Sequence, residues 1–243
     1  MSNPTVDLIL NHHSVRHYAS RKIEPEIIST LVKCAQAAAT SHYVQPYSIV
    51  SVTDREIQNQ LAELAGQKHI PNAAHIFVFV ADFNRHNSFI NASGDIFANA
   101  ENLLVAAIDS ALAAQNLTLA AESYGIGCCY LGSLRNDCRK VAELLNLPKL
   151  TFPLFGIACG YPEGDRATKK PRLPEKEVHY ENRYDTSHRA ENLAEYDQEI
   201  KEYYESRNSR QRIESWTGMM RDFLNKEARK EIGEILREQK MLD

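Results

Sequence analysis

The chain has 243 residues, of which 43% are hydrophobic and 25% charged, values typical of a folded domain and not of a disordered chain. Its formal net charge of −4 argues against a nucleic-acid-binding protein, which would carry a broad basic surface. The five cysteines are odd in number and contain no C-x-x-C pair, which argues against a disulfide framework and against a zinc knuckle. We expect them to be reduced thiols, most of them buried.

Targeting and membrane segments are not expected. The first ten residues lack a basic stretch followed by a sustained apolar run, which a secretory signal would contain. No stretch approaches the roughly twenty apolar residues that cross a bilayer. We therefore expect a soluble, cytoplasmic protein with no membrane partner.

The first third of the chain alternates between helical and strand-like patterns. Pro25 stands between two glutamates, as at a helix start, and an apolar stripe continues from it to Ala38. Residues 47–53 and 74–81 are short apolar runs that predict strands. Between them, Asp54 is suited to cap a further helix.

A long apolar segment dominates the middle of the chain. Residues 96–124 are rich in alanine and leucine and apolar nearly all round, and Gly125 is placed to end a helix there. Such a helix must be buried on most sides, either in the core or against another subunit. Two further strands are predicted at 125–132 and 152–162, where apolar runs are bordered by glycine and proline.

The last part of the chain has a different composition. Residues 191–243 are rich in charged residues, tyrosine and asparagine, with helical patterning. We interpret them as a helical excursion of the same domain, which follows a core formed by residues 1–190.

The stretch NHHSVRHY, residues 11–18, gathers three histidines, a serine and an arginine. If it is extended, the side chains of His12, Ser14 and Arg16 share one face. Three interpretations are open at this point: a solvated polar segment, a histidine metal site and an anion clamp. The metal site is disfavoured, because no carboxylate or cysteine stands beside the histidines at a familiar ligand spacing.

A second cationic segment is KKPRLP, residues 169–174. Pro171 favours an extended backbone, which would place Lys170 and Arg172 on the same side. A basic surface loop is the ordinary interpretation of such a segment. Together with the stretch 11–18, it suggests instead that two extended cationic segments converge on one anion.

Several segments, taken together, resemble one protein family. They run in order along nearly the whole chain: NHHSVRHY, AQAAATSHYVQPYSIVSVTD, AGQKHI, ADFNRH, AAQN, AAESYGIGCCYLGSLRN, FPLFGIACGYP and KKPRLP. In this set the chain resembles the nitroreductase superfamily, in its branch of oxygen-insensitive NADPH nitroreductases and NADPH:FMN oxidoreductases, the flavin reductase P branch. The resemblance implies an α+β fold with a mainly antiparallel central sheet surrounded by helices. It also implies a domain-interlocked homodimer, with the long central helix in the subunit contact.

The resemblance further implies an FMN at each of two subunit interfaces. His12 and Ser14, together with Lys170 and Arg172, would hold the phosphate and ribityl end of the flavin. Arg16 would lie nearer the pyrimidine edge. A fixed positive charge at that edge favours the reduced, anionic flavin.

Further contacts to the flavin are implied in the same way. Gln67 would hydrogen-bond the pyrimidine edge, and Thr40 with the loop after it would line the cofactor from the other side. In that loop this chain has His42 and Pro46, where family members often carry serines. The flavin would also face the main-chain N–H groups of a run of four residues, with a glycine that permits close approach: Tyr130, Leu131, Gly132 and Ser133.

The resembling proteins carry a mobile basic loop in the C-terminal part, whose arginines approach the 2′-phosphate of NADPH. Arg207 and Arg212 fall at the corresponding places, and Arg210 is additional. The resemblance thus implies an FMN-dependent NADPH oxidoreductase that passes two electrons, by ping-pong hydride transfer, to acceptors such as nitroaromatics, quinones or free flavin. No metal is implied. The alternative is a non-catalytic flavin-binding or flavin-sensing protein, and the sequence does not identify the physiological acceptor.

Overall fold

The computed structural model describes residues 3–90, 96–164, 169–206, 214–226 and 229–243. The chain forms two compact units: a first unit of Met1–Ala167 with Arg229–Asp243, and a second unit of Thr168–Ala228. The sequence analysis placed a boundary at residues 190 and 191, which lies inside the second unit. That the C-terminal part belongs to one domain with the core stays a prediction.

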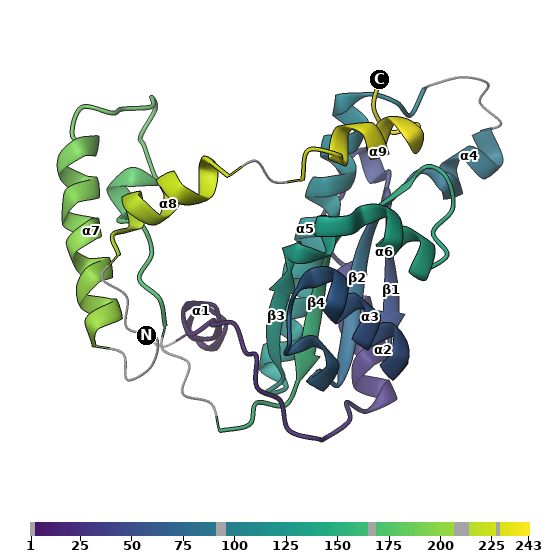
Figure 1. The fold of residues 1–243 in the computed structure, drawn as a ribbon, viewed down its shortest axis with the longest axis horizontal. Coiled ribbons are helices and arrows are strands. Elements are labelled where there is room, and N and C mark those ends of the chain that lie inside the picture. Colours follow the sequence, from purple (N-terminus) through teal and green to yellow (C-terminus); the bar gives the residue numbers. More distant parts are fainter. Residues whose placement is uncertain (1–2, 91–95, 165–168, 207–213, 227–228) are drawn as a thin grey trace. The chain divides into compact units, whose positions relative to one another are not determined.

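Figure 1 shows the order of the elements along the chain. In the described residues they are α1 (Pro4–Leu10), α2 (Pro25–Gln36), η1 (Ser41–Tyr43), β1 (Tyr47–Val52), α3 (Arg55–Ala65), η2 (Ile70–Asn72), β2 (His75–Asp82), α4 (Asn84–Ile90), α5 (Ala100–Ser123), β3 (Gly127–Leu131), η3 (Gly132–Asp137), α6 (Cys138–Leu144), β4 (Thr151–Gly160), η4 (Glu175–Glu177), α7 (Arg189–Glu205), α8 (Trp216–Leu224) and α9 (Ile232–Glu238).

The centre of the first unit is a four-stranded sheet in the order β1-β2-β4-β3 among the described residues, with every neighbouring pair antiparallel (Figure 1). All eight residues of β2 are buried, because the strand lies inside the sheet and both of its faces are covered. The predicted strands are confirmed, and each end differs from the prediction by two residues or less. The α+β class and the mainly antiparallel sheet are confirmed as well.

Helices cover both faces of this sheet. On one face, residues of α3, η3 and α6 pack with Val78 and Val80 of β2. On the other face, residues of α2 and α5 pack around Phe77 and Phe79 of the same strand. The alternation of side chains along β2 therefore divides its apolar residues between two layers of core.

Helix α5 begins at Ala100, later than the predicted start at residue 96, because Asn99 is the N-cap and accepts a hydrogen bond from the N–H of Asn102. It ends at Ser123, and Gly125 follows with a φ of +71°. The expectation that no stretch is long and apolar enough to cross a membrane is wrong for α5, which meets both criteria by length and composition. In the fold, α5 packs against α2 and the sheet.

The second unit has a small core of its own. Three residues of α7 are buried at its centre and pack with Trp216 and Met219 of α8: Tyr196, Ile200 and Tyr204. After α8 the chain returns to the first unit as α9, yellow in Figure 1. There Ile235, Leu236 and Met241 join a core cluster with residues of β4 and α6. The helical character predicted for the C-terminal part is confirmed in α7, α8 and α9.

The cysteines are all free thiols, and four of the five are buried, as predicted. Cys128 and Cys159 lie opposite each other on β3 and β4, with their sulfur atoms 3.4 Å apart. They belong to the core layer between the sheet and α5.

Candidate functional site

The histidine-rich stretch lies along the outer edge of β3. The N–H of Val15 donates to the carbonyl of Cys128 (2.9 Å), and Tyr18 forms a β-bridge with Pro162 after β4. The predicted strand-like alternation is not kept, because the two buried residues of the stretch, Val15 and Tyr18, are three positions apart. The Tyr18 hydroxyl donates to the Val15 carbonyl (2.7 Å) and so fixes this turn of the backbone.

Two glycines allow the stretch to lie this close to the sheet. A Cβ on Gly127 would stand 2.5 Å from Cγ2 of Val15, and a Cβ on Gly160 would stand 2.8 Å from Cδ1 of Tyr18. Both distances are shorter than van der Waals contact permits. The stretch therefore occupies the space that side chains at these two strand positions would fill.

Arg16 shares a neighbourhood with the loop that contains Gln67. Burial lowers the pKa of His69 in that loop, and the positive charge of Arg16 lowers it further. Burial raises the pKa of the Cys129 thiol on β3, and Arg16 opposes that rise. The Gln67 N–H donates to the carbonyl of Ala62 (3.0 Å) and closes the end of α3. Arg16 thus lies at the edge of β3 and close enough to His69 to affect its pKa. Gln67 is two residues before His69 in the same loop.

Thr40 is held by a buried carboxylate of α5. Its hydroxyl donates to Oδ2 of Asp109 (2.5 Å), and the N–H of Ser41 donates to Oδ1 (3.3 Å). Asp109 is only 2% exposed, so these donors supply the hydrogen bonds that a buried charge requires. In the loop that follows, three residues other than glycine have left-handed backbone conformations: His42, Tyr43 and Gln45.

The run from Tyr130 to Ser133 covers the end of β3 and the start of η3. The Tyr130 side chain is 38% exposed, whereas Leu131 is buried. The hydroxyl of Tyr130 accepts a hydrogen bond from Thr118 (3.2 Å) and donates one to Oε1 of Gln115 (3.4 Å). Both partners belong to α5, so this helix also fixes the ring of Tyr130.

His12 is tied to α5 as well. Its Nδ1 lies 2.5 Å from Oε1 of Glu122, in the last turn of the helix. In this way α5 contacts three of the predicted flavin-binding residues, which are His12, Thr40 and Tyr130. Sequence reasoning missed the four polar residues of α5 that make these contacts: Asp109, Gln115, Thr118 and Glu122. The available signal was that each of them interrupts an otherwise apolar helix.

Lys170 and Arg172 belong to the second unit, where tyrosines of α7 contact Lys170 and Pro171. The ammonium of Lys170 lies 5.3 Å from the ring centre of Tyr204, a cation–π contact. The Tyr196 hydroxyl donates to the carbonyl of Pro171 (3.1 Å), and a guanidinium nitrogen of Arg172 donates to the carbonyl of Lys170 (2.9 Å). That these two cations and the stretch 11–18 bind the same phosphate stays a prediction. Arg207 and Arg212 lie outside the described residues.

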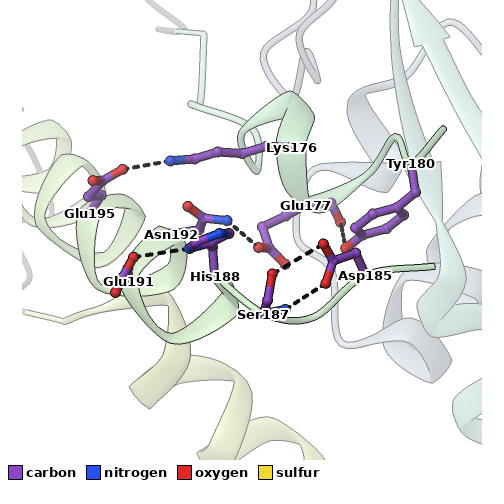
Figure 2. Close-up of a pocket in the computed structure, with 9 residues that line it drawn as sticks. All are labelled: Lys176, Glu177, Tyr180, Asp185, Ser187, His188, Glu191, Asn192 and Glu195. Carbon is purple, nitrogen blue, oxygen red and sulfur yellow. Dashed lines mark hydrogen bonds and ion pairs between the residues drawn. The ribbon is translucent and has the colours of Figure 1, made fainter. Parts of the chain in front are cut away.

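The second unit contains a cavity of about 380 Å³, and Figure 2 shows the residues that line it. Its acidic side chains are paired within the cavity wall: Lys176 with Glu195 (3.0 Å) and the amide of Asn192 with Glu177 (2.7 Å). Asp185 accepts from the N–H of Ser187 (2.8 Å). With four carboxylates among its lining residues, this cavity does not suit an anionic cofactor.

The side chains at the edge of β3 do suit one. Ser14 and Arg16 supply hydrogen-bond donors and a fixed positive charge, which match a phosphate and an electron-rich flavin edge. His12 adds its second ring nitrogen, Nε2, which suits a ribityl hydroxyl. The Nε2 atom of His69 is buried and has no hydrogen-bond partner among the described residues, so a polar ligand at this loop would satisfy it. Tyr130 adds an exposed aromatic surface on β3, next to α5. We conclude that these residues fit FMN.

The comparisons with known proteins agree with this fit. The model of the nitroreductase family matches residues 9–161, and that of its C-terminal domain matches residues 170–242. The chain is 43% identical to an NADPH-dependent oxidoreductase of Staphylococcus haemolyticus and 41% identical to the FMN reductase (NADPH) of Bacillus subtilis, over 97% of each chain in both cases. Its structure is similar to that of NfrA1 from B. megaterium, with a TM-score of 0.94, 43% identity and 98% of each chain covered. This chain belongs to the nitroreductase family.

Proposed function

We propose that this protein is an FMN-dependent oxidoreductase, which takes two electrons from NADPH and passes them to small-molecule acceptors. The observation that carries the proposal is its similarity, over 97% of both chains, to a relative named FMN reductase (NADPH). The donors and the positive charge gathered at the edge of β3 support it. Nitroaromatics, quinones and free flavin are the acceptor classes that we propose.

Two sets of residues hold the phosphate and ribityl end of the cofactor in this proposal. Ser14 provides a hydroxyl donor from the first unit, and His12 provides its Nε2 atom, because its Nδ1 faces Glu122. Lys170 and Arg172 provide cations from the second unit, and Arg172 brings the planar fork of donors that suits a phosphate. Each charge-assisted hydrogen bond contributes about 1.5–3 kcal/mol, so the loss of two cations should release the cofactor.

Another set of residues acts on the ring. FMN, when bound, supplies the hydride chemistry, and the protein supplies position and electrostatics. The guanidinium of Arg16 places a fixed positive charge where electron density increases on reduction, while Gln67 adds a hydrogen bond at the same edge. Thr40 and the run from Tyr130 to Ser133 line the ring from either side.

We infer that the protein is a cytoplasmic homodimer, with α5 in the contact between subunits. Leu104, Ile108 and Leu112 lie at intervals of four residues on α5 and are 43–55% exposed, so they form an apolar stripe on the solvent side. A dimer would cover the stripe.

The purified protein tests the proposal directly. We expect a yellow protein with one FMN per subunit, whose flavin is bleached by NADPH and recovers its colour when quinone or nitroaromatic is added. Bleaching without turnover of any acceptor would favour a flavin-binding or flavin-sensing protein instead. Replacement of Lys170 and Arg172 by Ala should release FMN, and full FMN occupancy in that variant would remove both residues from the site.

A further inference from the structure

Glu122 is one of the few charged residues on α5, and it is largely covered. Its side chain is 14% exposed, and that of His12 is 30% exposed. The charge of Glu122 also acts on the neighbouring Cys159 and Tyr130. A glutamate that serves only solubility would extend into water, as Glu101 does in the first turn of the same helix.

The contact between His12 and Glu122 fixes the imidazole. A carboxylate oxygen 2.5 Å from Nδ1 requires the proton on Nδ1, because an ionised carboxylate only accepts hydrogen bonds. The other ring nitrogen, Nε2, is then the one left to bind a ligand. A ring held in this way keeps one orientation and one tautomer, as second-shell carboxylates do for metal-binding histidines.

We propose that Glu122 is a positioning residue of the flavin site, which holds His12 with Nδ1 toward α5 and Nε2 toward the ribityl hydroxyls of FMN. The proposal rests on the proposed function, because it takes His12 as an FMN contact. Glu122 itself does not touch the cofactor. With the proton on Nδ1, Nε2 carries a lone pair and accepts a hydrogen bond, so its partner on FMN would be a ribityl hydroxyl, because ionised phosphate oxygens also only accept.

A double-mutant cycle tests whether Glu122 acts through His12. FMN affinity is measured by dilution of each purified holoenzyme and by the fluorescence of the released flavin. We expect Glu122→Ala to weaken FMN binding about tenfold, the size of one charge-assisted hydrogen bond. In a His12→Ala background the same change should have less than a twofold effect, since the partner is gone. Equal losses in both backgrounds, or no loss in either, would overturn the proposal.

Two further variants separate orientation, charge and general damage to the fold. Glu122→Gln retains an acceptor oxygen for the Nδ1 proton, so it should keep FMN affinity closer to that of the wild type than Glu122→Ala does. The matched control is Glu101→Ala, which removes the same charge from the same helix and should leave FMN affinity unchanged. A loss in the control as large as that in Glu122→Ala would mean that the net charge of α5, and not the contact with His12, is responsible.

The tautomer of His12 provides a readout that is independent of affinity. In NMR spectra of the ¹⁵N-histidine-labelled holoenzyme, the proton of the wild type should lie on Nδ1 and the preference should disappear in Glu122→Ala. An unchanged tautomer would refute the positioning role. If the wild type binds no FMN, the proposed function fails instead. If FMN binds tightly and His12→Ala has no effect, only the positioning role and the assignment of His12 fail.

Discussion

A methyl group added at Gly127 should loosen the stretch that carries the predicted flavin contacts. The Cβ of Gly127→Ala would stand 2.5, 2.6 and 2.8 Å from three carbon atoms of Val15. Val15 is 4% exposed, and its N–H is bound to the carbonyl of Cys128 at 2.9 Å, so it cannot move away without breaking that bond. Overpacking of this kind costs about 1–3 kcal/mol. We therefore expect a lower free energy of unfolding by about 2 kcal/mol and weaker FMN binding.

Urea unfolding of the full chain measures the first effect, at one fixed FMN concentration because a bound ligand adds stability by mass action. The control is Gly233→Ala in α9, where the new Cβ would lie 3.6 Å from a guanidinium nitrogen of Arg237, an ordinary contact. This change should be neutral or stabilising by up to about 1 kcal/mol. Val15→Ala removes two of the three clashing atoms and keeps only Cβ, so the double variant should lose less stability than the sum of both single losses. Strictly additive losses, or a Gly127→Ala protein as stable as the wild type, would refute the steric reasoning.

Other parts of the molecule lead to further expectations. Asp109→Asn replaces one of the two acceptor oxygens that hold Thr40 and the next N–H, so it should lower the free energy of unfolding in urea by about 1–2 kcal/mol; an unchanged midpoint would contradict this. Burial lowers the pKa of His75 from 6.5 to about 4, so the unfolded chain binds this proton more readily than the folded chain does. Stability should therefore be complete above about pH 6.5 and fall as the pH decreases toward 4, by at most about 1.4 kcal/mol per pH unit, and His75→Leu should flatten that part of a urea-unfolding profile. Arg207→Ala with Arg212→Ala should raise the KM for NADPH about tenfold or more, with little change for NADH or in FMN content, and steady-state kinetics that show equal changes for both nucleotides would contradict the assignment.

Local sequence signals were sufficient for most of the fold. Asp54 caps α3 by accepting from the N–H groups of Glu56 (2.8 Å) and Ile57 (3.1 Å), as predicted, because capping depends only on residues two or three positions away. The predicted start of the long helix was wrong by four residues for a physical reason. Phe97 is buried without being helical. An apolar residue indicates that a position is buried, but it does not indicate that the backbone there is helical.

The partners within the candidate site could not be predicted in this way. Asp109 reaches a residue 69 positions away, and Glu122 reaches one 110 positions away. No periodic pattern in the sequence predicts a contact between residues so far apart, because they come together only when α5 packs against the sheet. The sequence analysis therefore named His12 and Thr40 from the family resemblance but not the carboxylates that hold them.

The return of the chain to the first unit has a consequence for synthesis on the ribosome. The second unit interrupts the first, whose core cluster includes Ile235, Leu236 and Met241. Glu238 pairs with Arg139 of α6 (2.5 Å), and the carbonyl of Gln239 accepts from the N–H of Leu150 (3.2 Å). Arg139 and Leu150 leave the ribosome about a hundred residues before α9, which contacts them. This part of the core of the nascent chain therefore stays exposed to solvent until α9 has been synthesised. A stop codon placed just after α8 would thus spare every strand of the sheet and still leave a product prone to aggregation.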